Sequence, residues 1–206
     1  MAPLPMFPLG TVLLPHMLLP LHVFEPRYRT LMQHVLGGHR EFGVTLISRG
    51  HEVGGGDQRY DVGTVARVLQ AEELDDGRWL TVALGTRRVR VRRWLQDDPY
   101  PRADVDALPD GPLAPPEVAL RDVLADRLRR ILALQVELGH DDVDTELELA
   151  DDPAVACWQL AVLAPLSAHD AQRVLQADGW GHRLGVLDGL LDDLEQTLIL
   201  QRRHGG

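Results

Sequence analysis

The sequence offers few residues that could catalyse a reaction, and their spacing matches no recognised catalytic set. Lysine is absent, so all 21 basic residues are arginine. A phosphate-binding P-loop requires Gly-Lys-Ser/Thr, and a Ser-Lys dyad requires a lysine, so neither can form from these residues. Ser167, His169 and Asp170 lie too close together at one helix start to form a triad. The sequence therefore predicts no catalytic residues, with a hydrolase of unrecognised site as the minor alternative.

Metal ligation requires clustered side chains, and the sequence has no HExxH or CxxC pattern. Cys157 is the only cysteine, and its position on an apolar helix predicts a buried, inert thiol. Gly54, Gly55 and Gly56 do not join a strand to a helix, so they predict a hairpin loop rather than a phosphate site. We expect no metal and no cofactor. The histidine pairs lack ligand spacing: His16 with His22, His34 with His39, and His140 with His169.

A row of arginines is the strongest candidate for a charged binding surface. In Arg88-Val89-Arg90-Val91-Arg92 the alternation of a strand would place three guanidinium groups on one face, where they could contact phosphate or carboxylate. The alternative is a solvated face whose arginines pair with nearby acids such as Glu72 and Glu73. We favour this alternative, because the chain has a net charge of −10 and only 5% aromatic residues, whereas RNA-binding domains are usually basic with exposed aromatic rings.

An apolar stretch interrupted by six prolines runs from Pro3 to Tyr28. Proline breaks helices, so the stretch predicts short buried strands at Leu4–Phe7, Thr11–Leu14 and Leu18–Val23. The loop 15–19 contains Met17 between apolar neighbours and is typical of adaptable binding surfaces. The alternative is that this loop packs between the two halves of the chain.

The first half of the chain is predicted to be a β-rich unit with one helix. Gly85 is interpreted as a strand break and Asp76-Gly77 as a hairpin turn. The predicted helix is Arg27–Leu36, and the further strands are Phe42–Ile47, Tyr60–Leu74, Trp79–Leu84, Thr86–Leu95 and Arg102–Leu108.

The second half is predicted to be a helical bundle. Four prolines and a glycine make residues 109–116 a stiff linker, so the predicted units are residues 1–108 and 117–204. Asp152 with Pro153, and Ser167 with Asp170, are typical of helix starts. A leucine stripe follows, which could be internal core or a dimer seam, and we favour core: Leu184, Leu187, Leu191, Leu194 and Leu198.

Several motifs in this order resemble the N-terminal domain of Lon-type ATP-dependent proteases, a domain also present in small stand-alone bacterial proteins and in cereblon. The opening matches at Pro5–Leu9, Val12, Pro15, Leu19–Leu21, Phe24-Glu25 and Arg27-Tyr28. The family's β motifs resemble Val62–Ala66, Asp76-Gly77 and Gly85–Arg88. A helical motif resembles Leu166–Gln172 with Arg183-Leu184, although Ala171 stands where lysine is usual. The resemblance covers nearly the whole chain.

The resemblance implies an α+β fold: a PUA-like β pseudo-barrel followed by a C-terminal α-helical bundle. It also implies a stand-alone, non-catalytic module that binds unfolded or apolar polypeptide segments, or a specific protein partner. A groove between the subdomains or the exposed apolar loop would take up such segments. Nucleic-acid binding is the alternative. The single cysteine allows no intramolecular disulfide, which suits a reducing cytoplasm. No signal peptide or membrane span is expected. The candidate binding residues are His16, Met17, Leu18, Phe24, Tyr28, Arg88, Arg90 and Arg92.

Overall fold

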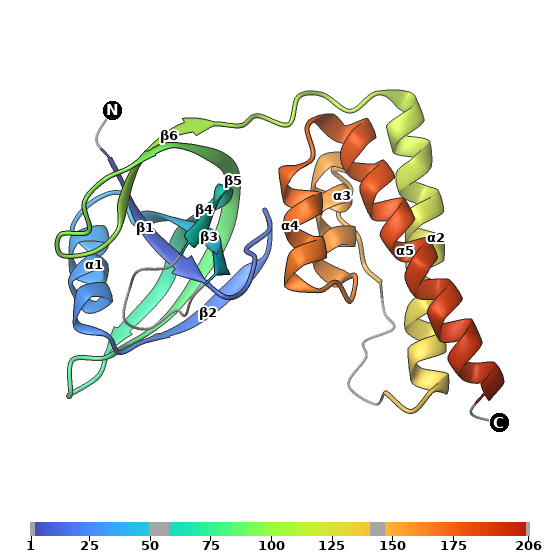
Figure 1. The fold of residues 1–206 in the computed structure, drawn as a ribbon, viewed down its shortest axis with the longest axis horizontal. Coiled ribbons are helices and arrows are strands. Elements are labelled where there is room, and N and C mark those ends of the chain that lie inside the picture. The colour runs from blue at the N-terminus through green and yellow to red at the C-terminus, as the bar shows by residue number, and fades with distance from the viewer. Residues whose placement is uncertain (1–2, 50–57, 141–146, 205–206) are drawn as a thin grey trace. The chain divides into compact units, whose positions relative to one another are not determined.

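The computed structural model describes residues 3–49, 58–140 and 147–204, and the chain divides into two compact units between Pro109 and Asp110. Figure 1 shows the strands together with one helix in the first unit and the remaining helices in the second. The described residues form one mixed six-stranded sheet and five helices, which confirms the predicted α+β class. The predicted loop at Gly54–Gly56 lies outside the described residues.

The sheet of the first unit closes into a barrel. Its strands are β1 (Leu4–Leu9), β2 (Leu18–Val23), β3 (Glu41–Arg49), β4 (Gln58–Glu73), β5 (Trp79–Trp94) and β6 (Arg102–Ala107). The strand order is β2-β5-β4-β3-β1-β6, and β6 pairs again with β5. One edge of the long strand β5 pairs with β4. Its other edge pairs first with β2 and then with β6, so β2 lies outside the closed ring.

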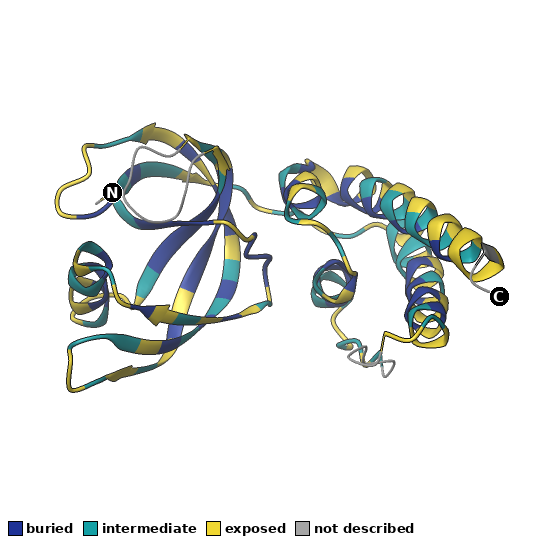
Figure 2. Ribbon diagram, turned by 60° about the horizontal axis from the view of Figure 1, so that its bottom comes forward, coloured by how far each residue is buried: buried dark blue, intermediate teal, exposed yellow. Residues whose placement is uncertain are grey.

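The barrel core is apolar, and the helix α1 (Pro26–Leu36) contributes to it. Figure 2 shows long buried stretches in the strands. Buried positions alternate with more exposed ones along β5, whereas β1, β3 and β4 contain continuous buried runs at Met6–Leu9, Phe42–Leu46 and Val62–Ala66. The ring of Tyr28 stacks on Phe7 at 4.0 Å between centroids, and both rings are buried. Helix α1 also buries Leu31, Met32 and Val35 in the same core. Pro26 begins α1, at a position where a missing N–H costs no hydrogen bond.

The structure differs from two strand predictions. Residues 11–14 are not a strand, although Val12, Leu13 and Leu14 are buried. A side chain supplies one of the missing hydrogen bonds, because the Thr64 hydroxyl donates to the Leu13 carbonyl oxygen at 2.5 Å. Gly85 does not break β5 either. A Cβ atom at Gly85 would lie 2.2 Å from the Leu14 carbonyl oxygen, so glycine allows the segment 11–14 to cross the strand closely.

The second unit consists of α2 (Pro115–Glu137), α3 (Pro153–Leu163), α4 (Ala168–Gln176) and α5 (Gly179–His204). The two long helices, α2 and α5, lie side by side (Figure 1). The last two residues of the predicted linker 109–116 belong to α2, because Pro115 begins that helix. The predicted caps of α3 and α4 are confirmed: Asp152 accepts from two backbone N–H groups, and Ser167 accepts from the Asp170 N–H.

A buried arginine joins the helices of this unit to the residues that precede them. Arg183 is 1% exposed, and its guanidinium lies 4.3 Å from the Trp158 ring centroid and 4.7 Å from that of Trp180. It ion-pairs with Asp110 at 3.1 Å. Trp158 donates its indole N–H to Asp110, and Trp180 donates to the Gly111 carbonyl oxygen. Asp110 and Gly111 are thereby fixed to the bundle.

Candidate functional site

The main candidate site is an apolar patch on the outer side of the barrel, where β2 pairs with β5. The antiparallel register sets Leu18 opposite Leu84, Pro20 opposite Val82 and His22 opposite Leu80. We call these six residues the β2–β5 face. Their neighbours along each strand point inward, since Leu19, Val23, Thr81 and Ala83 are buried. Leu18 is 56% exposed and Leu80 is 45% exposed, so apolar side chains occupy a surface that usually carries polar ones.

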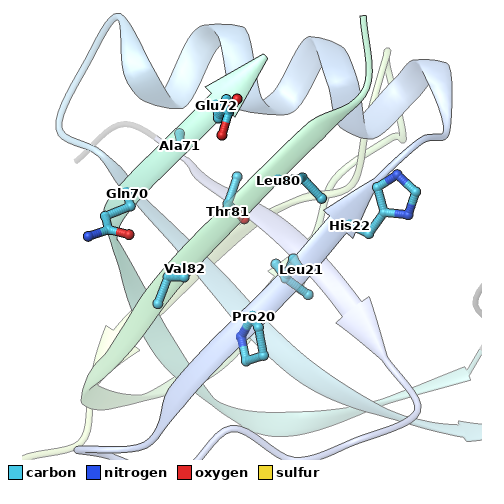
Figure 3. Close-up of a pocket in the computed structure, with 9 residues that line it drawn as sticks. All are labelled: Pro20, Leu21, His22, Gln70, Ala71, Glu72, Leu80, Thr81 and Val82. Carbon is cyan, nitrogen blue, oxygen red and sulfur yellow. The ribbon is translucent and has the colours of Figure 1, made fainter. Parts of the chain in front are cut away.

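A hollow of about 660 Å³ lies on this face. Figure 3 shows that three adjacent strands line it, with β5 between β2 and β4. Most of the lining residues are apolar, and the polar ones are His22, Gln70, Glu72 and Thr81. Leu69 is the extra residue of a β-bulge in β4 and is also exposed. A largely apolar lining with a few polar groups is typical of surfaces that bind other chains.

A second, smaller hollow of about 100 Å³ lies at the end of β2. Phe24 is 52% exposed beside it, whereas Tyr28 is a core residue with 3% exposure. The guanidinium of Arg27 lies 4.5 Å from the Tyr28 ring centroid and bonds to Glu25 at 3.1 Å. Tyr28 therefore supports the hollow from within, and Phe24 offers the accessible ring.

The apolar loop before β2 brings only part of the predicted set to the surface. His16 is exposed and adopts a positive φ of 65°, and its N–H donates to the Gly85 carbonyl oxygen at 2.8 Å. Met17 is half-buried and packs against the barrel core. Leu18 belongs to the β2–β5 face and is exposed.

The predicted row of three exposed arginines is interrupted. Arg90 and Arg92 are exposed, but Arg88 is only 3% exposed. Arg88 lies opposite Thr64 in the sheet, and Thr64 is buried where its hydroxyl bonds to Leu13, so this part of the sheet is covered. Arg92 pairs with Asp106 at 3.2 Å rather than with the acids expected from the sequence.

The described residues contain no group of three or more His, Cys, Asp or Glu that could hold a metal ion. The Cys157 thiol is buried, and burial raises its pKa to about 11, which makes it a poor nucleophile at neutral pH. Within the same described residues, no helix has the length and apolar character needed to cross a membrane.

Sequence reasoning missed Leu80, Val82 and Leu84 as site residues. The signal was present in Trp79–Leu84, where the positions alternating with the core residues are apolar as well. A strand that is apolar on both faces is either covered on both sides or presents an apolar surface, and the sequence alone does not distinguish these cases.

A family model and several curated proteins match nearly the whole chain. The family model of the ATP-dependent protease La (LON) substrate-binding domain matches residues 3–193. Lon protease 2 of Herpetosiphon aurantiacus is 30% identical over 207 residues, which cover 98% of this chain and 25% of that protein. Lon protease of Desulfovibrio desulfuricans is 27% identical over 205 residues, covering 97% of this chain and 23% of that protein. The chain thus spans about a quarter of the length of these curated relatives.

Two solved structures are also similar to this chain. The Lon N-terminal domain protein from Xanthomonas campestris has a TM-score of 0.66 and 31% sequence identity, covering 92% of this chain and 98% of that chain. The N-terminal domain of Mycobacterium avium complex Lon protease has a TM-score of 0.67 and covers 93% of this chain and 99% of that chain. Its identity of 18% supports likeness of fold alone.

Proposed function

We propose, since this chain belongs to the family of ATP-dependent protease La (LON) substrate-binding domains as its motifs predicted, that it binds polypeptide segments and catalyses no reaction itself. The family description names a substrate-binding domain, and the substrates of a protease are polypeptides. The absence of lysine from these residues excludes a P-loop or a Ser-Lys dyad within them. The proposed role of the chain is therefore to recognise polypeptides. The proposal also includes that it does so in the cytoplasm.

The observation that carries this proposal is the exposed apolar β2–β5 face with its hollow of about 660 Å³. A folded protein buries most of its own leucines, whereas an unfolded segment exposes them. Binding that removes these leucines from water lowers the free energy of the system. Leu18 and Leu80 offer apolar surface from two adjacent strands of a rigid barrel. Phe24 extends the binding surface toward the end of β2.

Fluorescence anisotropy with a labelled, permanently unfolded polypeptide tests the proposal. We expect Leu80→Glu to weaken binding by about tenfold or more, because a carboxylate replaces an apolar contact at the centre of the face. Val123→Glu is the matched control, since Val123 is an exposed apolar residue of α2 with 56% exposure. Equal affinities for the wild type and Leu80→Glu would exclude the β2–β5 face as the site.

The nucleic-acid alternative loses support from the burial of Arg88, because only Arg90 and Arg92 of that row remain exposed. A labelled single-stranded RNA titrated in parallel provides its test. Binding that falls steeply with salt and is lost when both exposed arginines become glutamine would favour this alternative.

A further inference from the structure

The strand β2 has an edge to which no described strand is paired. It pairs with β5 on one side only, whereas β1, β3, β4 and β5 each have neighbours on both sides. Open strand edges present backbone N–H and C=O groups that can pair with another chain, and folded proteins usually cover or interrupt them. Pro20 lies within β2. Proline has no N–H to donate to a neighbouring strand, so it is tolerated in strands at the edge of a sheet.

The register identifies the backbone groups that point to this edge. Gly85 donates its N–H to the Met17 carbonyl oxygen at 2.9 Å, so the hydrogen-bonded positions of this antiparallel pair are Met17 and every second residue after it. Pro20 falls at a non-bonded position, as its missing N–H requires. The N–H groups of Leu18 and His22, and the carbonyl groups of Leu18, Pro20 and His22, therefore face away from β5.

Hollows lie on both sides of this edge. The larger one, on the outer face, includes Pro20 and His22 in its lining, and the smaller one is lined by Phe7, Leu9 and the end of β2. Side chains of an added strand would alternate between the two sides. One set would extend the β2–β5 face beside Leu18, Pro20 and His22, at the β2 margin of the larger hollow, and the other would approach the smaller hollow beside Phe24.

The charge near the end of β2 favours a basic ligand. Glu72 lines the larger hollow next to Leu80, and both Glu72 and Glu73 are exposed. Arg78 also reaches this end of β2, with its guanidinium 3.3 Å from the His22 ring, but it pairs with Asp76 at 2.7 Å. Residues 1–109 are neutral as a whole, with 13 arginines and 13 acidic residues, so the local attraction comes from Glu72 and Glu73. A segment with lysine or arginine beside its apolar residues is therefore attracted to this edge, and an acidic segment is repelled.

We propose that an extended, basic-flanked segment of substrate polypeptide adds to the β2 edge as a further strand, with apolar side chains at alternate positions. This inference rests on the proposed function and specifies its mode. Backbone hydrogen bonds supply affinity for many sequences, and the apolar surfaces on the two sides of β2 favour apolar side chains in the added strand. Such a mode requires an extended backbone, which an unfolded chain supplies and a folded protein does not. It also disfavours proline at ligand positions that donate to the edge.

The direct test is amide hydrogen exchange of the wild-type protein with a heptapeptide of sequence Lys-Val-Thr-Val-Thr-Val-Lys. We expect exchange at the Leu18 and His22 amides to slow by about tenfold or more on binding, because both N–H groups gain partners. A peptide with glutamate at both ends should bind at least several-fold more weakly. Binding without protection of these two amides would overturn strand addition.

A pair of variants isolates the backbone contribution. His22→Pro removes an N–H that faces the open edge and no hydrogen bond of the sheet, and His22→Ala removes the side chain but keeps the N–H. We expect His22→Pro to bind the peptide about tenfold more weakly than His22→Ala, with circular dichroism confirming that both are folded. Equal affinities of the two variants would contradict the inference.

The outcomes separate this inference from the function on which it rests. If the wild type binds neither the peptide nor a permanently unfolded polypeptide, the proposed function fails. If it binds both but His22→Pro behaves as His22→Ala, the function stands and strand addition fails. A protein that dimerises through β2 in sedimentation analysis, and loses peptide binding as it does so, would show that a second copy occupies the edge and would also overturn the inference.

Discussion

Replacement of Arg183 by leucine should destabilise the helical unit strongly. The side chain is 1% exposed, stacks on Trp158 and Trp180, ion-pairs with Asp110 and donates to the Ala177 carbonyl oxygen at 2.9 Å. A cation stacked on an aromatic ring in a desolvated site contributes about 1–2 kcal/mol. Removing one partner of a buried ion pair costs about 3–5 kcal/mol.

The net loss should lie at the low end of that range. Leucine restores some stability because no guanidinium then has to be removed from water. The remaining carboxylate of Asp110 is partly exposed, at 23%, and keeps its hydrogen bond from Trp158. We therefore expect the free energy of unfolding to fall by about 3 kcal/mol, which is a large fraction of the stability of a domain this size.

Urea denaturation followed by far-ultraviolet circular dichroism measures this loss, because the helical unit dominates that signal. With a denaturant slope of about 1–3 kcal/mol per molar, the midpoint should fall by about 1–3 M. Arg173→Leu is the control, since Arg173 is 52% exposed and pairs only at the surface with Asp170, a contact of about 0.5 kcal/mol. Equal midpoints for Arg183→Leu and this control would refute the reasoning.

Three further predictions concern single residues in the two units. Gly85→Ala should lower the free energy of unfolding by about 1–3 kcal/mol, because the added Cβ would meet the Leu14 carbonyl oxygen. Gly185→Ala on α5 has open space around the added Cβ and should not destabilise the protein, and urea denaturation of each variant tests this difference. Cys157 should resist alkylation in the folded protein at neutral pH and react after unfolding, which mass spectrometry can follow. The hydrogen bond from Arg87 lowers the pKa of Glu41. The stability that the Glu41 carboxylate contributes is therefore complete above the ordinary glutamate pKa and is lost as pH falls through the lowered pKa. Glu41→Gln should remove this part of the acid dependence when unfolding is measured as a function of pH.

Local pattern predicted the elements well where one face of each element is buried and the ends carry proline or glycine. The strand Leu18–Val23 and the helix starts at Asp152 and Ser167 follow from proline placement and capping residues. Gly85 was misread, because a glycine in a strand can mark either a break or a close crossing. The distinction depends on the segment around Leu14, which is distant in sequence, so the strand itself holds no local sign of it.

The candidate site was less predictable than the fold, because it depends on which strands become neighbours. Leu18 was identified from its exposed apolar loop, but Leu80 and Val82 join it only through the register of β2 on β5. Arg88 alternates with valines as an exposed strand residue would, but it is buried. The segment 11–14, which is distant in sequence, covers that part of the sheet. Coverage of a sheet face is a tertiary property that strand periodicity does not report.

The most direct test of the central claim is a two-dimensional NMR titration of the isotope-labelled protein with a permanently unfolded polypeptide. The account predicts that shifted or broadened amide signals cluster at Leu18–Phe24 and Trp79–Leu84, with the helical unit as an internal reference. Perturbations confined to other surfaces, or an unchanged spectrum at saturating polypeptide, would contradict polypeptide binding at the β2–β5 face.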